Sequence, residues 1–237
     1  WAVLRFRIDT ALAVVKYLLA GLSEWHGAGG FHGGLIPTAL LVRPVAHYGL
    51  PPEIQCACWQ ARVVCGPSIV PIPKMTDVGL REIREAEFEK YLSTLGLIFS
   101  NGRLQGELGA LNPEDIDAAL QATANPLMLY SPPEVVRGAG CVGPQIDLFF
   151  CGLLLFEVLS GRYPFRERSD YTTLSKMLDP EYRPVSVQRF NPVVSDALAG
   201  VVHRAIDKDP ARRYPTAGAF LCALEEAELS SGEIWRG

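Results

Sequence analysis

The sequence has no block of basic residues and no apolar run long enough to cross a membrane. Its 237 residues include 22 Lys and Arg against 26 Asp and Glu, which gives a net charge of −4. This balance argues against a nucleic-acid partner and against a polybasic lipid-binding surface. The longest uncharged apolar run, residues 148–156, is far shorter than the roughly 20 residues of a spanning helix. We therefore predict a soluble protein without a transmembrane segment.

No signal in the sequence names a compartment. The first apolar stretch, residues 8–22, contains Asp9 and Lys16, whereas the apolar region of a signal peptide carries no charge. A targeting segment upstream of Trp1 remains an open alternative, so the localisation is left unknown.

Cysteine is too sparsely placed for a zinc site of the usual spacing. Three of the six cysteines are isolated, and the other three cluster at Cys56, Cys58 and Cys65. A structural zinc site usually uses four ligands with Cys-x2-Cys spacing, whereas this cluster has Cys-x-Cys spacing and the nearest histidine is His47. Free buried thiols and a local disulfide are the favoured alternatives for the cluster, and a metal site is the less favoured one.

What the sequence does contain predicts a mainly helical domain with small β elements, an α+β fold. Hydrophobic residues make up 49% of the chain and charged residues 20%, which is typical of a globular protein. Apolar residues recur at helical spacing in several segments, and residues 147–160 are apolar nearly all round, which is typical of a buried helix. The predicted helices are 8–25, 87–99, one that begins after Asn112, 147–160, 194–207 and 216–229. The predicted short strands are 40–42, 61–65 and 69–72.

Three motifs follow one another in the last hundred residues. Residues 130–134 read Tyr-Ser-Pro-Pro-Glu, and Asp147 opens the apolar helix that runs on to Gly-Arg-Tyr-Pro-Phe at 161–165. Near the end, residues 207–213 read Asp-Lys-Asp-Pro-Ala-Arg-Arg. In this order and spacing they resemble the C-terminal lobe of eukaryotic-type protein kinases. The resemblance implies that Asp147 begins the central helix and that Glu134 pairs with Arg213, all three in structural roles.

The same resemblance places the catalytic loop at residues 31–42, where the side chains that carry the chemistry are missing. His32 matches the first residue of the family pattern His-Arg-Asp-Leu-Lys-Pro-x-Asn. Gly33 replaces its Arg, Gly34 its Asp, Ile36 its Lys and Ala39 its metal-binding Asn. Phosphoryl transfer needs a carboxylate near the acceptor hydroxyl and ligands for Mg²⁺.

No nearby acidic residue can replace the lost carboxylate, because no Asp or Glu occurs between Trp25 and Pro52. Loss of a positioned base costs about 10²–10⁴ in rate. Asp77, in an Asp-Val-Gly turn, resembles the Asp of the family that holds Mg²⁺ on the nucleotide. We expect no cofactor, with residual binding of ATP and Mg²⁺ at Asp77 as the alternative; the structural interpretation of Asp77 is a turn residue.

The resemblance covers residues 1–237 as one C-lobe domain with two departures. Residues 43–73 and 81–127 are longer than the family needs and are interpreted as insertions. The N-lobe is expected to be absent from this chain, since no Gly-rich loop, Val-Ala-x-Lys strand or partner helical Glu occurs in it.

These observations predict a pseudokinase that binds or scaffolds protein partners through the two insertions, possibly within a larger complex. One alternative is an active or weakly active serine/threonine-type kinase whose N-lobe lies outside this sequence. Another is a purely structural subunit. Both insertions contain large apolar residues that should be buried on the lobe or against a partner. These are Trp59, Ile69, Val70 and Ile72 in the first, and Phe88, Tyr91, Leu92, Leu95 and Phe99 in the second.

Overall fold

The structure is a computed structural model that describes most of the C-terminal half and separate segments of the N-terminal half. The described residues are 8–33, 35, 40–45, 70–75, 98–100, 103–105, 127–136, 143–168 and 170–230. The helices are α1 (Ile8–Gly27), α5 (Leu127–Tyr130), α6 (Pro133–Val136), α7 (Pro144–Ser160), α8 (Asp170–Leu178), η3 (Val187–Arg189), α9 (Asp196–Ala205), η4 (Pro210–Arg212) and α10 (Ala217–Ser230). The strands are β1 (Leu40–Val45), β2 (Val70–Met75), β3 (Ile98–Ser100) and β4 (Arg103–Gln105). The predicted mainly helical architecture is confirmed.

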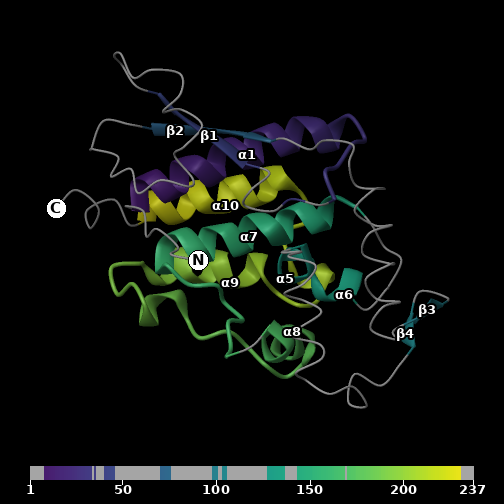
Figure 1. The fold of residues 1–237 in the computed structure, drawn as a ribbon. Coiled ribbons are helices and arrows are strands. Elements are labelled where there is room, and N and C mark those ends of the chain that lie inside the picture. The colour runs from purple at the N-terminus through teal and green to yellow at the C-terminus, as the bar shows by residue number, and fades with distance from the viewer. Residues whose placement is uncertain are drawn as a thin grey trace.

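Four helices form the core of the described part. The first helix, α1, packs on α7 and α10, and α9 packs on the same two helices (Figure 1). The apolar face predicted for residues 8–22 is the buried one, with Leu12, Val15, Leu19 and Leu22 at most 2% exposed. Helices from the two ends of the chain therefore share one core, so α1 cannot bury its face without the C-terminal helices.

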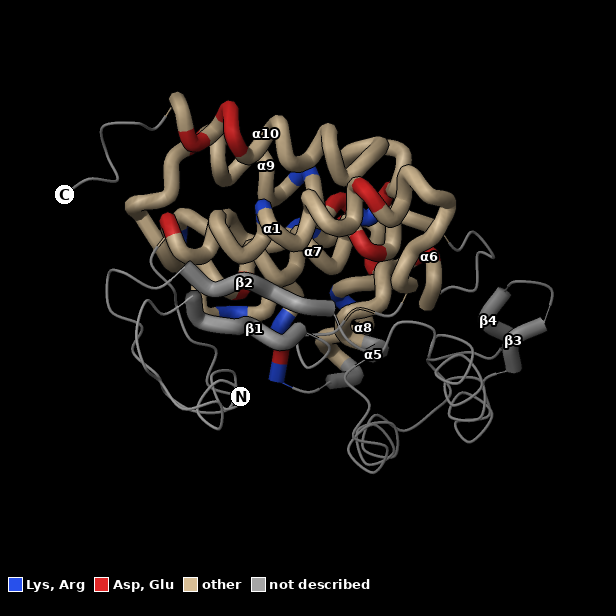
Figure 2. Tube along the Cα trace, turned by 90° about the horizontal axis from the view of Figure 1, so that it is seen from above, with Lys and Arg blue, Asp and Glu red and all other residues tan. Residues whose placement is uncertain are grey.

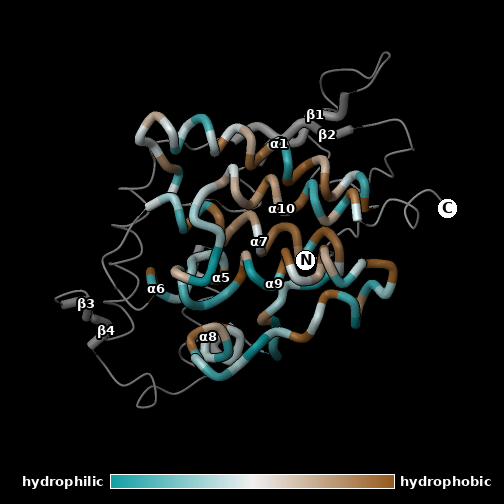
Figure 3. The backbone as a smooth tube through the Cα atoms, turned by 180° about the vertical axis from the view of Figure 1, so that it is seen from behind, coloured by the Kyte–Doolittle hydropathy of each residue, from teal (hydrophilic) through white to brown (hydrophobic). Residues whose placement is uncertain are grey.

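The most completely buried element is α7, as its sequence predicts. Every residue from Ile146 to Ser160 is buried, and Figure 3 shows α7 between α10 on one side and α9 on the other. The helix begins three residues before the predicted start, because Pro144 occupies its first turn, where a missing N–H costs nothing. A helix without a polar face must have neighbours all round, and α7 has them.

Gly152 sets the distance between α7 and α9. A Cβ at this position would lie 2.7 Å from the Cβ of Ala205 and 2.9 Å from Cγ2 of Ile206. Any side chain here would therefore push apart two helices that bury the centre of the lobe.

The strands form two separate antiparallel pairs. Leu40 of β1 pairs with Met75 of β2, and Val45 pairs with Val70. Residues 46–69, which include most of the first predicted insertion, therefore connect two paired strands. The predicted strands at 40–42 and 69–72 coincide with β1 and β2, whereas the one predicted at 61–65 lies outside the described residues.

One predicted helix is wrong at its C-terminal end. The helix expected over residues 87–99 was to include Phe99, but Phe99 lies in β3, which pairs with β4. The sequence signal was Asn101-Gly102, a pair typical of two-residue hairpin turns, which outweighs helical spacing at the end of a segment. Residues 87–97 and the helix predicted after Asn112 lie outside the described residues.

Charged residues are few in the core helices and gather at element ends. Acidic residues are concentrated at the C-terminal end of α10 (Figure 2), where Glu225, Glu226 and Glu228 lie. Glu228 pairs with Lys16 of α1, with Nζ 2.6 Å from Oε2, so this end of α10 is also tied to the N-terminal helix. Among the helices described, none is long and apolar enough to cross a bilayer.

The close approach at Gly152 predicts that Gly152→Ala destabilises the lobe. Overpacking of a filled core costs about 1–3 kcal/mol, which should exceed the gain of about 1 kcal/mol from replacing a helical glycine by alanine. Urea denaturation of both proteins measures the difference.

The matched control is Gly200→Ala in α9, where a Cβ would meet nothing within 4 Å. This variant should be more stable than wild type by about 0.5–1 kcal/mol. If the two substitutions changed stability in the same direction, the packing account of Gly152 would be wrong.

Candidate functional site

Asp147 joins the start of α7 to the segment that follows α1. Its side chain is fully buried and accepts hydrogen bonds from the backbone N–H groups of His32 and Gly33, both at 2.8 Å. Nε2 of His26, in the last turn of α1, lies 3.0 Å from Oδ2 of the same carboxylate. Three groups that follow one another closely in sequence therefore converge on one buried acid, which offsets the cost of burying it.

The residues that bind Asp147, His32 and Gly33, are those that the resemblance places at the start of the catalytic loop. Gly33 has a φ of 73°, in the left-handed region that favours glycine. His32 is buried and its ring lies edge-on to Trp25, with the centroids 6.1 Å apart. His32 and Gly33 are thus held by main-chain hydrogen bonds and packing. The other expected site positions, Gly34, Ile36, Ala39 and Asp77, lie outside the described residues.

Glu134 and Arg213 form the ion pair that the resemblance predicts. Nη1 and Nη2 of Arg213 each donate to a different carboxylate oxygen of Glu134 at 2.7 Å. The guanidinium is fully buried, donates from Nε to the carbonyl oxygen of Asp207 at 2.7 Å, and lies over the ring of Phe149 at 4.5 Å. This pair ties α6 to the turn before α10 across α7, and breaking such a pair costs about 3–5 kcal/mol.

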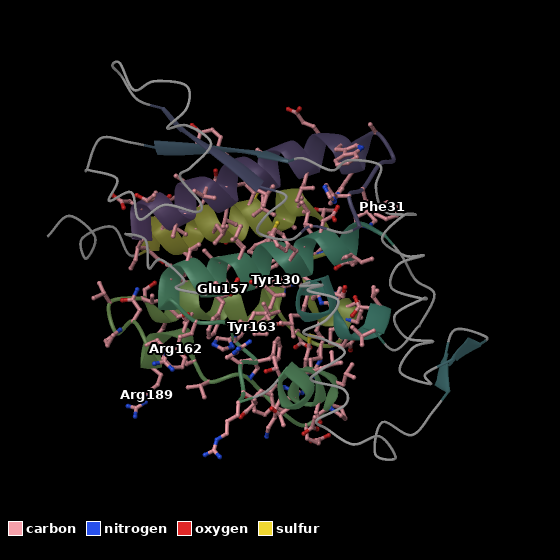
Figure 4. All side chains as sticks on the ribbon, viewed as in Figure 1. Phe31, Tyr130, Glu157, Arg162, Tyr163 and Arg189 are labelled. Carbon is pink, nitrogen blue, oxygen red and sulfur yellow. The ribbon has the colours of Figure 1, made fainter. Side chains whose placement is uncertain are left out.

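A second buried acid, Glu157, lies in the last turn of α7. The hydroxyl of Tyr130, at the end of α5, donates to both of its carboxylate oxygens at 3.1 and 2.9 Å. Tyr163, in the turn after α7, packs edge-on against Tyr130 with the ring centroids 5.6 Å apart. Figure 4 shows these three side chains together near the centre of the lobe, with Phe31 at the far end of α1.

Burial decides the protonation of this cluster. It raises the pKa of Glu157 from 4.5 to about 7, although the hydrogen bond from Tyr130 favours the carboxylate. Burial, and then the charge of Glu157, raise the pKa of Tyr130 and of Tyr163 above their usual value. Near neutral pH, Glu157 is therefore partly protonated, whereas Tyr130 and Tyr163 stay neutral.

Comparisons with known proteins bear on the whole lobe. Over 88 residues, 37% of this chain, it is 38% identical to the serine/threonine-protein kinase PrkC of Bacillus subtilis, of which it covers 13%. Over 216 residues, 91% of this chain, it is 24% identical to the serine/threonine-protein kinase pkn3 of Myxococcus xanthus, of which it covers 31%. The crystal structure of Rad53 1–466 in complex with AMP-PNP aligns with 92% of this chain and 40% of that one at a TM-score of 0.51, with 16% sequence identity.

The chain is a protein kinase-like domain. No protein-family model matches it, and the alignments above span less than a third of the two curated kinases. The likeness to Rad53 shows a shared fold and nothing of function. The chain therefore corresponds to only a part of each of these longer kinases.

The resemblance predicts a donor set that differs from the two-ligand magnesium site of active protein kinases. Such kinases hold Mg²⁺ through an Asp of the Asp-Phe-Gly turn and an Asn of the catalytic loop. The resemblance assigns the first position to Asp77 and the second to Ala39, which offers no side-chain oxygen. In the described part of the chain, no group of three or more His, Cys, Asp or Glu could hold a metal ion. Cys56, Cys58 and Cys65 lie outside that part.

The sequence alone does not assign a role to Tyr130 or Glu157 in the kinase-like domain. The available signal was that Glu157 is the sole charged residue between Asp147 and Arg162. A carboxyl group in an apolar helix needs a partner, but its identity follows only once α5 has packed against α7. Helix α8 was missed as well, because only its face with Leu174 and Met177 is buried.

The raised pKa of Glu157 predicts a pH-dependent contribution to stability. The folded domain keeps a proton up to pH about 7 that the unfolded chain releases near pH 4.5. The stabilisation is complete below pH 4.5 and is lost as pH rises through about 7, a change of roughly 3 kcal/mol. Glu157→Gln removes this titration, so the stability of wild type relative to the variant should fall across this range in denaturant unfolding.

The variant Glu225→Gln controls for the removal of a carboxylate as such, because Glu225 is exposed on α10. If wild type and Glu157→Gln gave parallel profiles of stability against pH, the proposed titration of Glu157 would be ruled out.

Proposed function

We propose that this kinase-like domain is a pseudokinase, which binds or scaffolds protein partners and transfers no phosphoryl group. The observation that carries the proposal is the sequence His32-Gly33-Gly34, where the resemblance expects His-Arg-Asp. The absence of any Asp or Glu between Trp25 and Pro52 leaves no carboxylate nearby in the sequence to orient a substrate hydroxyl. Ala39 in place of the metal-binding Asn removes a second requirement of the reaction.

The hydrogen bonds of Asp147 support this proposal by explaining how the loop can persist without its chemistry. They reach the main-chain N–H groups of His32 and Gly33, so they do not depend on the side chain at position 33. Substitutions that abolish catalysis would therefore leave the anchor of the loop intact. The domain can keep its fold for a binding role.

The second candidate is an active or weakly active serine/threonine kinase, and the retained Asp77 is the observation in its favour. An N-lobe elsewhere in a longer protein would supply the nucleotide-covering parts. It would not restore the groups replaced by Gly34 and Ala39.

The proposal predicts no phosphoryl transfer from radiolabelled ATP with Mg²⁺ to generic protein substrates, measured on the full-length protein. Wild type and Asp77→Ala should both give background incorporation. Glu225→Ala, an exposed acidic substitution on α10, controls for loss of a carboxylate elsewhere. Incorporation by wild type and Glu225→Ala that disappears in Asp77→Ala would refute the pseudokinase proposal in favour of the active kinase.

We further propose that residues 43–73 and 81–127 carry the contacts with partners. Loops longer than about 12–15 residues within compact domains are usually functional or disordered, and these two are rich in large apolar side chains. The paired ends of β1 and β2 support the proposal for the first segment, since residues 46–69 can extend from the hairpin without interrupting it.

Replacement of Phe88 and Leu92 by Ser should abolish the capture of partners without lowering the melting temperature. Leu229→Ser, at a position 81% exposed on α10, is the matched apolar control outside the insertions. Pull-down and thermal unfolding are compared for the three proteins. Unfolding without a separable loss of binding would instead mean that the insertions cover the lobe itself.

A further inference from the structure

A pocket of about 260 Å³ lies between the end of α9 and the extended stretch that follows α8. Arg183 and Pro184 line it from one side, and His203, Arg204, Asp207 and Lys208 line it from the other. Its volume is below the roughly 300–1,000 Å³ of pockets for drug-sized ligands. The pocket therefore suits a small group rather than a whole nucleotide.

The pocket is positively charged within a negatively charged chain. Arg183, Arg204 and Lys208 contribute three positive charges against the single carboxylate of Asp207, whereas the whole chain has a net charge of −4. Oδ1 of Asp207 already accepts the backbone N–H of Asp209 at 2.9 Å. The local excess of positive charge favours an anionic occupant.

Two of the three cations keep donors for a ligand. Arg204 lies over the ring of Tyr214 at 4.3 Å and donates from Nε to the carbonyl oxygen of Arg212 at 3.4 Å. Arg183 donates from Nη1 to the carbonyl oxygens of Pro180 and Tyr182. Within the described ranges, neither guanidinium has a carboxylate partner.

Lys208 and His203 also line the pocket, Lys208 as a third cation and His203 as a polar ring. The amine of Lys208 donates to the carbonyl oxygens of Lys176 and Asp179, so it fixes the end of α8 and contributes charge to the pocket. Nε2 of His203 is buried and, among the described residues, has no hydrogen-bond partner. Burial lowers the pKa of His203, so its ring is mainly neutral at neutral pH.

We propose that this pocket binds a phosphate group, carried either by a small molecule or by a phosphorylated side chain. Two guanidinium groups with unused N–H donors match the oxygens of phosphate, because arginine binds such anions in a bidentate fashion. The pocket has a net charge of about two positive units, which matches a phosphate dianion better than it matches a ligand with a single carboxylate. The proposal holds whether or not the domain transfers phosphoryl groups, since none of these residues belongs to the expected catalytic loop.

Isothermal titration calorimetry of the full chain with inorganic phosphate, against chloride at equal ionic strength, should show saturable binding. Arg183→Gln should weaken it roughly tenfold, the effect of losing one charge-assisted contact. Asp207→Asn should strengthen it, because it removes the one negative charge of the pocket and keeps the Oδ1 acceptor. Arg189→Gln is the control and should change nothing, because Arg189 extends away from the lobe (Figure 4) and does not line the pocket.

Acetate and a phosphoserine peptide form the other two arms of the experiment. If the phosphoserine peptide binds more tightly than inorganic phosphate, the natural ligand is a phosphorylated protein. If its affinity is equal or weaker, the natural ligand is a small molecule that carries a phosphate group. Phosphate binding no stronger than that of acetate or chloride would overturn the proposal. Equal losses in Arg183→Gln and Arg189→Gln would also overturn it, because they would indicate nonspecific attraction to surface charge.

Discussion

The carboxylate of Asp147 is the constraint on which the arrangement of the lobe depends. A buried, charged side chain is tolerated only with several hydrogen bonds, and here the donors come from His26, His32 and Gly33. Since His26 lies in the last turn of α1 and Asp147 in the first turn of α7, the two helices and the start of the loop are positioned together. The hydrogen bonds to Asp147 hold α1 against α7, and the packing of α1 on α7 and α10 buries the apolar faces of these helices.

The second constraint is the complete burial of α7. A helix with no solvent-facing side needs contacts on every side, and α1 and α9 supply many of them. Arg213 extends this arrangement, because its guanidinium pairs with Glu134 and lies over Phe149 of α7. The acids of α7 therefore have separate partners: Asp147 holds the loop backbone, and Glu157 holds Tyr130.

The contacts that hold this domain together do not use the side chains that the resemblance expects to take part in catalysis. The anchor of the loop uses main-chain N–H groups, so it does not depend on the side chain at position 33, where the resemblance expects arginine and the sequence has glycine. The pair of Glu134 and Arg213 likewise links α6 to the turn before α10. A kinase-like domain can lose its catalytic side chains and keep its core, which is the basis for proposing a binding role. The cationic pocket at the end of α9 uses none of these structural contacts and adds a site of its own.

Much of the fold could be predicted from the sequence because its signals were local and strong. The unbroken apolar run of α7, the helical spacing of α1 and the ordered motifs around Glu134, Asp147 and Arg213 led to the mainly helical lobe. The prediction that Gly33, Gly34 and Ala39 replace catalytic side chains likewise comes from the sequence, since it depends on residue identity and on the resemblance.

Only the tertiary structure decided which distant groups meet. Phe99 lies in a strand, contrary to its helical spacing, because β3 pairs with β4. The bond from Tyr130 to Glu157 joins residues 27 positions apart, and Arg183 meets Arg204 at one pocket because the stretch after α8 packs beside the end of α9. The sequence determined which segments must be buried and which residue types stand at the positions that the resemblance assigns to the catalytic loop. The packing of α5, α8 and α9 decided the rest, because burial energy depends on neighbours that local periodicity does not specify.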